Sequence, residues 1–317
     1  MTKKIKIQDP IHRPYVFIRE RFSTENQCLD AIFQARAVKE IGCYRCSGSL
    51  SNYFKVPGRP MYQCSLCFFR VSPRAGTIFD HTHIKLTDWF HVTIDKILHN
   101  TGITANKVAY QYTIGNDAAS YLLEKIRKWI SMADEVGPLT GHIEIDEVAI
   151  KTGTKGLGRD RRKKRGFGSD TITIFLSMVE RGGRVKSFKI PNREEDTIIP
   201  IIVDNVAIDA KISTDEFKVY NKLKSLGYKH VTVNHSKNEY KKDDASTNSI
   251  EGFFGIMKPS IQATYRQISD QHVQEYVNEF NFRYNNRHNP LDVRFEKLLK
   301  CLPPLFAHLE YKLKKSA

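Results

Sequence analysis

The chain contains the stretch Asn248-Ser-Ile-Glu251-Gly-Phe-Phe-Gly-Ile-Met-Lys258, which decides how the rest of it is interpreted. At about 100° per residue on a helix, Asn248, Glu251 and Lys258 fall along one side. Apolar side chains recur at i, i+4 and i+7 on another side: Ile250, Phe254 and Met257. The pattern predicts a helix over about residues 245–258 that buries one face and presents a carboxylate and a lysine. A solvated ion pair is the simpler interpretation of that polar side.

Two acidic residues upstream favour a functional interpretation. Asp146 lies in His142-Ile-Glu-Ile-Asp146-Glu-Val-Ala-Ile150, whose apolar residues predict a strand. Asp215 closes a short strand at 211–214, before a helical-looking segment at 217–226. Aspartates at two strand ends, with Glu251 on a helix 36 residues after Asp215, can converge as oxygen ligands. Such a cluster holds Mg²⁺ or Mn²⁺.

The other elements expected after residue 141 indicate an α/β fold. Strands are predicted at 171–179, 184–190 and 230–233, and helices at 196–206 and 270–287. This succession suits a mixed sheet with flanking helices. Pro259 follows Lys258 directly and is expected to end or kink the helix there.

Three segments resemble, in their order and spacing, the catalytic blocks of DDE transposases. They are Ile-Asp-Glu at 145–147, Thr-Asp-x4-Tyr ending at Tyr220, and Asn-x2-Glu-x6-Lys at 248–258. The sequence is most similar to the zinc-ribbon group of insertion-sequence transposases, which is related to the Merlin elements. The resemblance covers about residues 25–290. It implies a ribonuclease H-like catalytic domain with acidic residues on the first strand, the fourth strand and a late helix.

The resemblance also implies roles for single residues. Asp146, Asp215 and Glu251 would hold catalytic Mg²⁺ or Mn²⁺ for an in-line attack on a phosphodiester. Lys258 would steady a substrate phosphate. Asn248 would orient the helix or replace Glu251 as the third ligand, and the sequence leaves that choice open.

The expected function is therefore that of a transposase, which binds insertion-sequence ends, cuts DNA and transfers strands. One alternative is a catalytically inactive, transposase-derived DNA-binding protein. Another is a nuclease of the same fold that cuts without strand transfer. A transposase is expected to form a homo-oligomer when assembled on DNA.

The charge balance favours a polyanionic partner. The chain has 317 residues, a formal net charge of +15 and a pI near 9.4, which favours nucleic acid. No apolar run of 18 residues is present to span a bilayer, and no apolar segment of a signal peptide follows the basic N-terminus. We expect a protein that works in the reducing cytoplasm of a bacterium, associated with the nucleoid.

Four of the six cysteines form two pairs, Cys43-x2-Cys46 and Cys64-x2-Cys67, with seventeen residues between the pairs. Each pair is typical of a knuckle that turns two thiolates toward one Zn²⁺, and strands near residues 53–55 and 61–63 complete a zinc ribbon. Unliganded thiols or disulfides are the alternative, but disulfides are disfavoured inside cells. The resemblance makes the ribbon part of a DNA-recognition apparatus with a structural metal.

A helical region follows the ribbon, from about residue 86 to 130. Its three expected helices are interpreted either as a helix-turn-helix or as a connector that packs on the catalytic domain. Gly137-Pro138 marks the expected domain boundary. The predicted parts are a flexible N-terminus (1–24), the zinc ribbon (25–80), the helical DNA-binding segment (81–137), the catalytic domain (138–300) and a C-terminal tail (301–317).

A basic loop is predicted between the first two strands of the catalytic domain. Residues 151–165 carry eight basic residues against one acidic residue, interleaved with glycines. A solvated flexible loop is one interpretation, and a loop that grips DNA phosphates is the other. The candidate DNA-binding residues are Lys155, Arg159, Arg161, Arg162, Lys163, Lys164 and Arg165.

Overall fold

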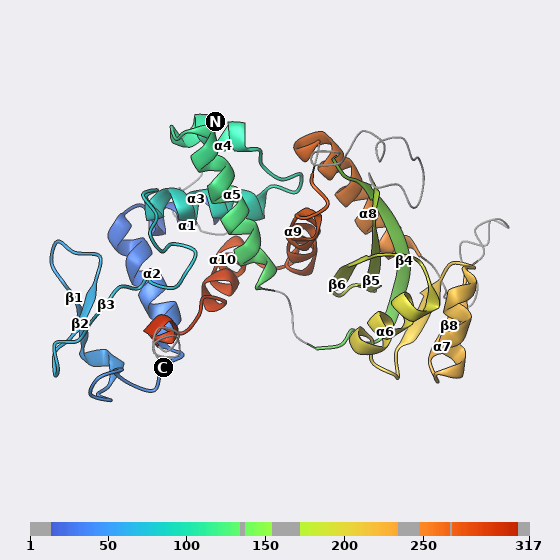
Figure 1. Ribbon diagram of the computed structural model, residues 1–317, viewed down its shortest axis with the longest axis horizontal. Helices are drawn as coiled ribbons and strands as arrows, with labels where there is room; N and C mark the ends of the chain where they lie inside the picture. The colour runs from blue at the N-terminus through green and yellow to red at the C-terminus, as the bar shows by residue number, and fades with distance from the viewer. Residues whose placement is uncertain (1–13, 134–136, 154–171, 234–246, 267, 310–317) are drawn as a thin grey trace, which may run out of the picture. The chain divides into compact units, whose positions relative to one another are not determined.

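The computed structural model describes residues 14–133, 137–153, 172–233, 247–266 and 268–309 (Figure 1). The chain divides into two compact units. The first contains residues 1–99, 105–133 and 289–317, and the second contains residues 100–104 and 134–288. Among the described residues, no helix has both the length and the apolar character that a membrane span requires.

The first unit combines a small antiparallel sheet with helices. Its strands are β1 (Tyr53–Lys55), β2 (Tyr62–Cys64) and β3 (Arg70–Val71), in the order β1-β2-β3, with the 3-10 turn η1 (Leu50–Asn52) before β1. Its helices are α1 (Pro14–Arg21), α2 (Glu25–Ala37), α3 (Leu86–Leu98), α4 (Ala105–Tyr112), α5 (Asn116–Ser131) and α10 (Leu291–Lys300). A capping box between Thr24 and Gln27 fixes the start of α2.

Helix α10 belongs to the first unit, whereas the predicted catalytic domain extended to residue 300. The reason is a cluster of aromatic side chains in the core. Phe295 packs against Phe90 of α3, with ring centroids 5.0 Å apart, and lies 6.2 Å from Trp129 of α5. The indole nitrogen of Trp129 also donates to the carbonyl of Leu298 at 2.8 Å. These contacts fix α10 on α3 and α5.

The second unit is built on a five-stranded mixed sheet in the order β6-β5-β4-β7-β8 (Figure 1). The strands are β4 (His142–Lys151), β5 (Ile172–Glu180), β6 (Val185–Ile190), β7 (Lys211–Thr214) and β8 (Lys229–Thr232). Strands β4, β5 and β6 pair antiparallel, and β7 runs parallel to both β4 and β8. All five predicted strands are confirmed, and β4 lies at the centre of the sheet.

Helices pack on both faces of this sheet. On one face, α6 (Glu195–Asn205) covers Ile143 and Ile145 of β4, together with η3 (Lys218–Asn221) and α7 (Lys222–Ser225). On the other face, α8 (Asn248–Ser260) and α9 (Val273–Asn285) cover Val148 and Ile150. Because alternate residues of a strand point to opposite faces, β4 contributes to both cores.

Helix α8 follows the predicted pattern but passes through Pro259. The predicted apolar residues Ile250, Phe254 and Met257 are buried, and Asn248, Glu251 and Lys258 are exposed. The helix ends at Ser260 and continues into the π-helical turn η5 (Ile261–Tyr265). Proline lacks an amide proton, so the regular hydrogen-bond pattern is lost just beyond it rather than at Lys258.

Candidate metal centres

The first candidate centre is a group of three carboxylates, two from the middle of the central strand β4 and one from the residue that follows β7. The expectation that Asp146 lies at a strand end is wrong, because pairing with β5 continues β4 to Lys151. Ligand oxygens of Asp146, Glu147 and Asp215 all lie within 4.8 Å of one another. Parallel pairing of β4 and β7 matches Glu144 with Ser213, so continuing that register by two residues sets Asp146 beside Asp215. Two adjacent strands thus bring together residues 69 positions apart in the sequence.

The electrostatics of Asp146 favour a bound cation. The pKa of Asp146 is raised to about 6, mainly by burial and also by the carboxylates of Glu147 and Asp215, while a hydrogen bond from the Glu147 amide and the charge of Arg193 oppose the shift. That amide donates to Oδ1 of Asp146 at 2.7 Å. Ionised carboxylates this close repel one another, and a divalent cation between them would remove the repulsion. Oxygen ligands are the kind that Mg²⁺ and Mn²⁺ prefer, so the donor set fits either ion.

Glu147 was not among the predicted site residues, although its position next to Asp146 was a signal. Its side chain is 1% exposed, and Arg193 donates to its Oε2 at 2.9 Å. The hydroxyl of Tyr220 donates to Oε1 at 2.8 Å. Arg193 therefore balances the charge of Glu147 on the α6 side of the sheet, which makes Glu147 a supporting residue of the group.

Asp215 is fixed by a turn at the end of β7. Its Oδ1 accepts a hydrogen bond of 3.0 Å from the amide of Phe217, which starts the segment that leads to Tyr220. This turn explains the spacing of the Thr-Asp-x4-Tyr motif, because it returns Tyr220 to the acidic group.

Glu251 lies outside the group of three carboxylates. It is exposed on the first turn of α8, and its Oε1 accepts a hydrogen bond of 2.9 Å from the hydroxyl of Thr247. Asn248 is exposed on the same turn, and Lys258 is exposed near the other end of the helix. The structure thus brings Asp146 and Asp215 together, while the metal-binding roles of Glu251 and Asn248 stay predictions.

The second candidate centre is formed by the four predicted cysteines. The sulfurs of Cys43, Cys46, Cys64 and Cys67 all lie within 4.8 Å of one another. Cys43 Sγ is 3.6 Å from Cys67 Sγ, and Cys46 Sγ is 3.8 Å from Cys64 Sγ. Four sulfurs at about 2.3 Å from a tetrahedral Zn²⁺ are roughly 3.8 Å apart. The spacing therefore fits a closed structural zinc site.

The two cysteine pairs have the same local backbone. Cys43 N donates to Gly48 O and Cys64 N donates to Phe69 O, five residues ahead in each case. The residue after each second cysteine has a positive φ, 57° at Ser47 and 59° at Phe68. Two knuckles that bind one Zn²⁺ are expected to share this backbone geometry. Phe68 is unusual there, because a bulky side chain rarely adopts a left-handed conformation.

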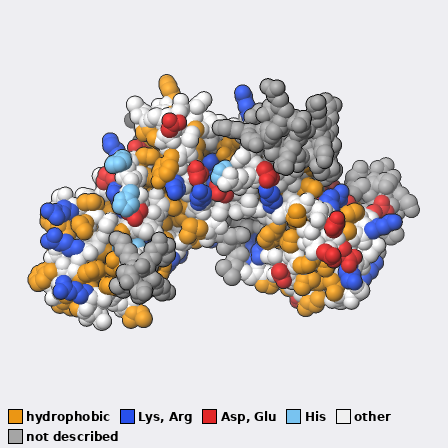
Figure 2. Space-filling view, viewed as in Figure 1, with side chains coloured by type: hydrophobic (Ala, Val, Ile, Leu, Met, Phe, Trp, Pro, Cys, Tyr) orange, Lys and Arg blue, Asp and Glu red, His pale blue; other side chains and the backbone are white. Residues whose placement is uncertain are grey.

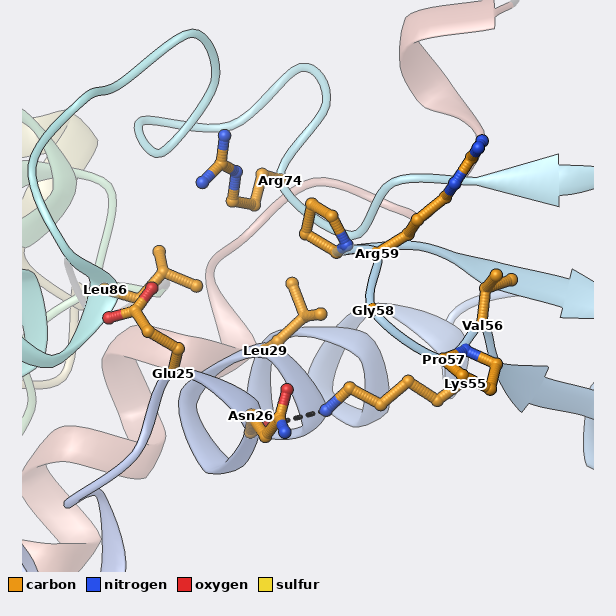
Figure 3. A pocket seen from close by; sticks show the side chains of 11 residues that line it. Glu25, Asn26, Leu29, Lys55, Val56, Pro57, Gly58, Arg59, Arg74 and Leu86 are labelled. Atoms are coloured by element: carbon orange, nitrogen blue, oxygen red, sulfur yellow. Dashed lines mark hydrogen bonds between the residues drawn. The ribbon is translucent and has the colours of Figure 1, made fainter.

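A cavity of about 410 Å³ lies beside the ribbon, between α2, the β1–β2 turn and the start of α3. Figure 3 shows Lys55, Arg59 and Arg74 around it, with Glu25 on the helix side. Lys55 is held by Asp30, at 2.9 Å. The excess of positive charge around the cavity suits an anionic ligand better than a metal ion.

The predicted basic loop lies within residues 154–171, outside the described residues, and its DNA-binding role stays a prediction. The predicted helical segment forms α3, α4 and α5, with Thr113-Ile-Gly115 between α4 and α5. A turn of three residues suits a helix-turn-helix.

Comparisons with known proteins point to one class. Residues 138–285 match the ISXO2-like transposase domain. Over 275 residues, the chain is 23% identical to an uncharacterized protein in transposable element ISH50 of Halobacterium salinarum, covering 83% of this chain and 91% of that protein. Over 103 residues, it is 29% identical to an uncharacterized transposase-like protein of Haemophilus influenzae, covering 32% of this chain and 82% of that protein.

Proposed function

Because residues 138–285 form a transposase domain of the ISXO2-like family, we propose that the protein binds insertion-sequence ends, cuts DNA and transfers the cut strand. The observation that carries this proposal is the proximity of Asp146 and Asp215, whose carboxylate oxygens lie within 4.8 Å. Paired carboxylates contributed by adjacent strands are suited to hold the divalent cation that phosphodiester chemistry uses.

The sheet supports a ribonuclease H-like catalytic domain. In the architecture that the sequence resembles, acidic residues lie on the first strand, the fourth strand and a late helix. Here Asp146 lies on β4, the first strand of the sheet, and Asp215 directly follows β7, the fourth. Glu251 lies on α8. The order of elements therefore agrees with the proposed fold.

Each residue of the site would have a separate role in the reaction. Asp146 and Asp215 would hold Mg²⁺ or Mn²⁺, and Glu251 or Asn248 would complete the ligand set from α8. When bound, the cation supplies a Lewis acid that activates a water or a 3′-hydroxyl and stabilises the leaving oxygen. Lys258 would bind a substrate phosphate as a point charge. Arg193 and Tyr220 hydrogen-bond to Glu147, which would keep the part of β4 next to Asp146 in place.

DNA binding would fall mainly to other parts of the chain. The basic loop from Lys155 to Arg165 would contact phosphates near the cut site. In the first unit, Figure 2 shows lysine and arginine side chains next to hydrophobic ones over β1–β3. Phe68 and Phe54 are 69% and 45% exposed there. Exposed aromatic rings among basic residues suit contact with DNA bases and backbone. A Zn²⁺ on the four cysteines would hold this surface together.

The decisive experiment compares wild-type protein with Asp215→Asn on labelled element-end DNA. We expect Mg²⁺-dependent cutting and joining by the wild type, and binding without cutting by the variant. Binding without any cutting by the wild type would favour the alternative of a catalytically inactive DNA-binding protein. Cutting without joining would favour a nuclease. Formation of a homo-oligomer on the DNA ends is checked in the same samples by sedimentation.

A further inference from the structure

Glu144 is a fully buried carboxylate on the same strand as Asp146. It lies two residues before Asp146 on β4, so the two side chains point to the same face of the sheet. Glu144 is 0% exposed. Its Oε1 accepts a hydrogen bond of 2.7 Å from Nε of Arg181, in the turn after β5. Its Oε2 accepts two more hydrogen bonds, and both come from α8.

Those two donors are backbone amides in the first turn of α8. Ser249 N lies 2.7 Å and Ile250 N 3.0 Å from Oε2 of Glu144. Amides in the first turn of a helix have no partner within the helix, and a side chain at the N-cap usually supplies one. The N-cap residue Thr247 makes no such bond, because its hydroxyl donates to Glu251. A carboxylate from the sheet takes the place of the cap and also meets the positive end of the helix dipole.

A contribution to folding stability is a weak explanation for a buried carboxylate such as that of Glu144. Removing a carboxylate from water is costly, and a buried ion pair often stabilises a protein no more than apolar residues of similar volume. What Glu144 does provide is a fixed connection. It ties the turn that carries Asn248 and Glu251 to the strand that carries Asp146.

We propose that Glu144 is a positioning residue of the catalytic centre, which holds the first turn of α8 where Glu251 can serve the same cation as Asp146 and Asp215. The proposal rests on the proposed function. Glu144 would act without touching the substrate or the cation, since its carboxylate oxygens accept hydrogen bonds from Arg181 and from two amides of α8.

The test maps which parts of the backbone surround the cation. With Fe²⁺ bound in place of Mg²⁺, added hydrogen peroxide is reduced by the iron to hydroxyl radicals, and ascorbate restores Fe²⁺. The radicals cut nearby peptide bonds, and the fragments are identified by mass spectrometry. In wild-type protein we expect cuts near Asp146, near Asp215 and in residues 247–252. In Glu144→Gln we expect the cuts near Asp146 and Asp215 to remain and the cuts in α8 to fall at least about tenfold. A neutral amide makes weaker hydrogen bonds than a carboxylate, so the first turn of α8 would be held less firmly near the cation.

Glu180→Gln is the matched control. Glu180 is also a carboxylate of this sheet paired with an arginine: it accepts from Arg184 and from the amide of Thr140. These partners lie outside α8, so its variant should keep all three sets of cuts. If Glu144→Gln fails to fold, Glu144→Asp takes its place, since it keeps the charge but withdraws the carboxylate by about 1.5 Å.

Cleavage of DNA gives an independent readout. Glu144→Gln should slow cleavage at least about tenfold, and adding it to Glu251→Gln should cost little more, because residues that act as one unit are not additive. The positioning role would be overturned if Glu144→Gln left the cuts in α8 unchanged. It would also be overturned if Glu144→Gln slowed DNA cleavage by the same factor in Glu251→Gln as in the wild type. Absence of wild-type cuts near both aspartates would instead overturn the metal site itself, and the positioning role with it.

Discussion

Tyr220 donates a hydrogen bond of 2.8 Å to Glu147, which joins two of the three sequence blocks that suggested a transposase. Burial raises the pKa of Tyr220 well above its ordinary value, and the charge of Glu147 adds to the effect. The phenol therefore stays protonated and remains a donor at any physiological pH. The Tyr of the Thr-Asp-x4-Tyr block thus supports the strand that carries Asp146.

Zinc content tests the four-cysteine centre. We expect about one tightly bound Zn²⁺ per chain, and chelation should unfold residues 40–70 because metal binding supplies folding free energy there. Cys64→Ser should lose the metal. Cys301→Ser is the control, because Cys301 lies outside the group. Freshly purified protein without zinc by elemental analysis would contradict the zinc ribbon.

Phe68→Gly should stabilise the folded ribbon. Phe68 has a φ of 59° and is 69% exposed, so glycine relieves a left-handed conformation at little loss of packing. The expected gain in the free energy of unfolding is about 1 kcal/mol, measured by denaturant titration with zinc present. Phe54→Gly is the control: Phe54 is an exposed aromatic on β1, where glycine should destabilise by about 0.5–1 kcal/mol. Equal effects of both variants would refute the argument from backbone strain.

The pKa of Asp146 predicts how stability depends on pH. Burial and neighbouring carboxylates raise this pKa from 3.8 to about 6, so the folded state binds the proton more tightly than the unfolded state. The resulting stabilisation is complete below about pH 4 and is lost as the pH rises through 6. In metal-free buffer at pH 8, neutral Asp146→Asn should therefore be more stable than the wild type, by about 1–3 kcal/mol.

Thermal unfolding over pH 4–8 measures this difference, which should vanish at the acidic end. Mg²⁺ should raise the Tm of the wild type but not that of Asp146→Asn, because the variant lacks the charge that holds the cation. A variant that is less stable than the wild type at pH 8 would mean that Asp146 is well solvated or already paired.

Salt dependence tests the basic loop. Replacing Arg162, Lys163 and Lys164 with alanine should weaken binding to all DNA sequences alike and flatten the plot of log affinity against log salt by roughly 0.9 per lost phosphate contact. A control variant removes the same charge from exposed lysines of the second unit: Lys222, Lys224 and Lys229. Identical slopes for both variants would show that the loop is only solvated surface.

The elements of the second unit could be predicted because local patterns determine them. Alternating apolar residues gave the five strands to within about two residues, and i, i+4, i+7 spacing gave α8. Asp146 and Asp215 were predictable as candidate ligands because each is an acidic residue within, or directly after, an apolar strand. Their proximity, in contrast, depends on the pairing of β4 with β7.

Contacts between distant segments could not be predicted in this way. In Ile143-Glu-Ile145, the alternation of apolar and polar residues predicts that Glu144 faces solvent. Glu144 is buried instead, because α8, about a hundred residues further along the chain, packs against it. The pairing of Glu147 with Arg193 and the packing of Phe295 in the first unit likewise depend on tertiary structure.

The central claim is that Glu251 is the third metal ligand beside Asp146 and Asp215. It is tested most directly by the rate of Mg²⁺-dependent cleavage of element-end DNA by Glu251→Gln and by Asn248→Ala. Glu251→Gln keeps the size of the side chain and removes its charge, so cleavage should fall at least about a hundredfold while DNA binding survives. Asn248→Ala should retain most of the activity. Collapse of cleavage in Asn248→Ala, with Glu251→Gln nearly intact, would transfer the role to Asn248 and contradict the account given for Glu251.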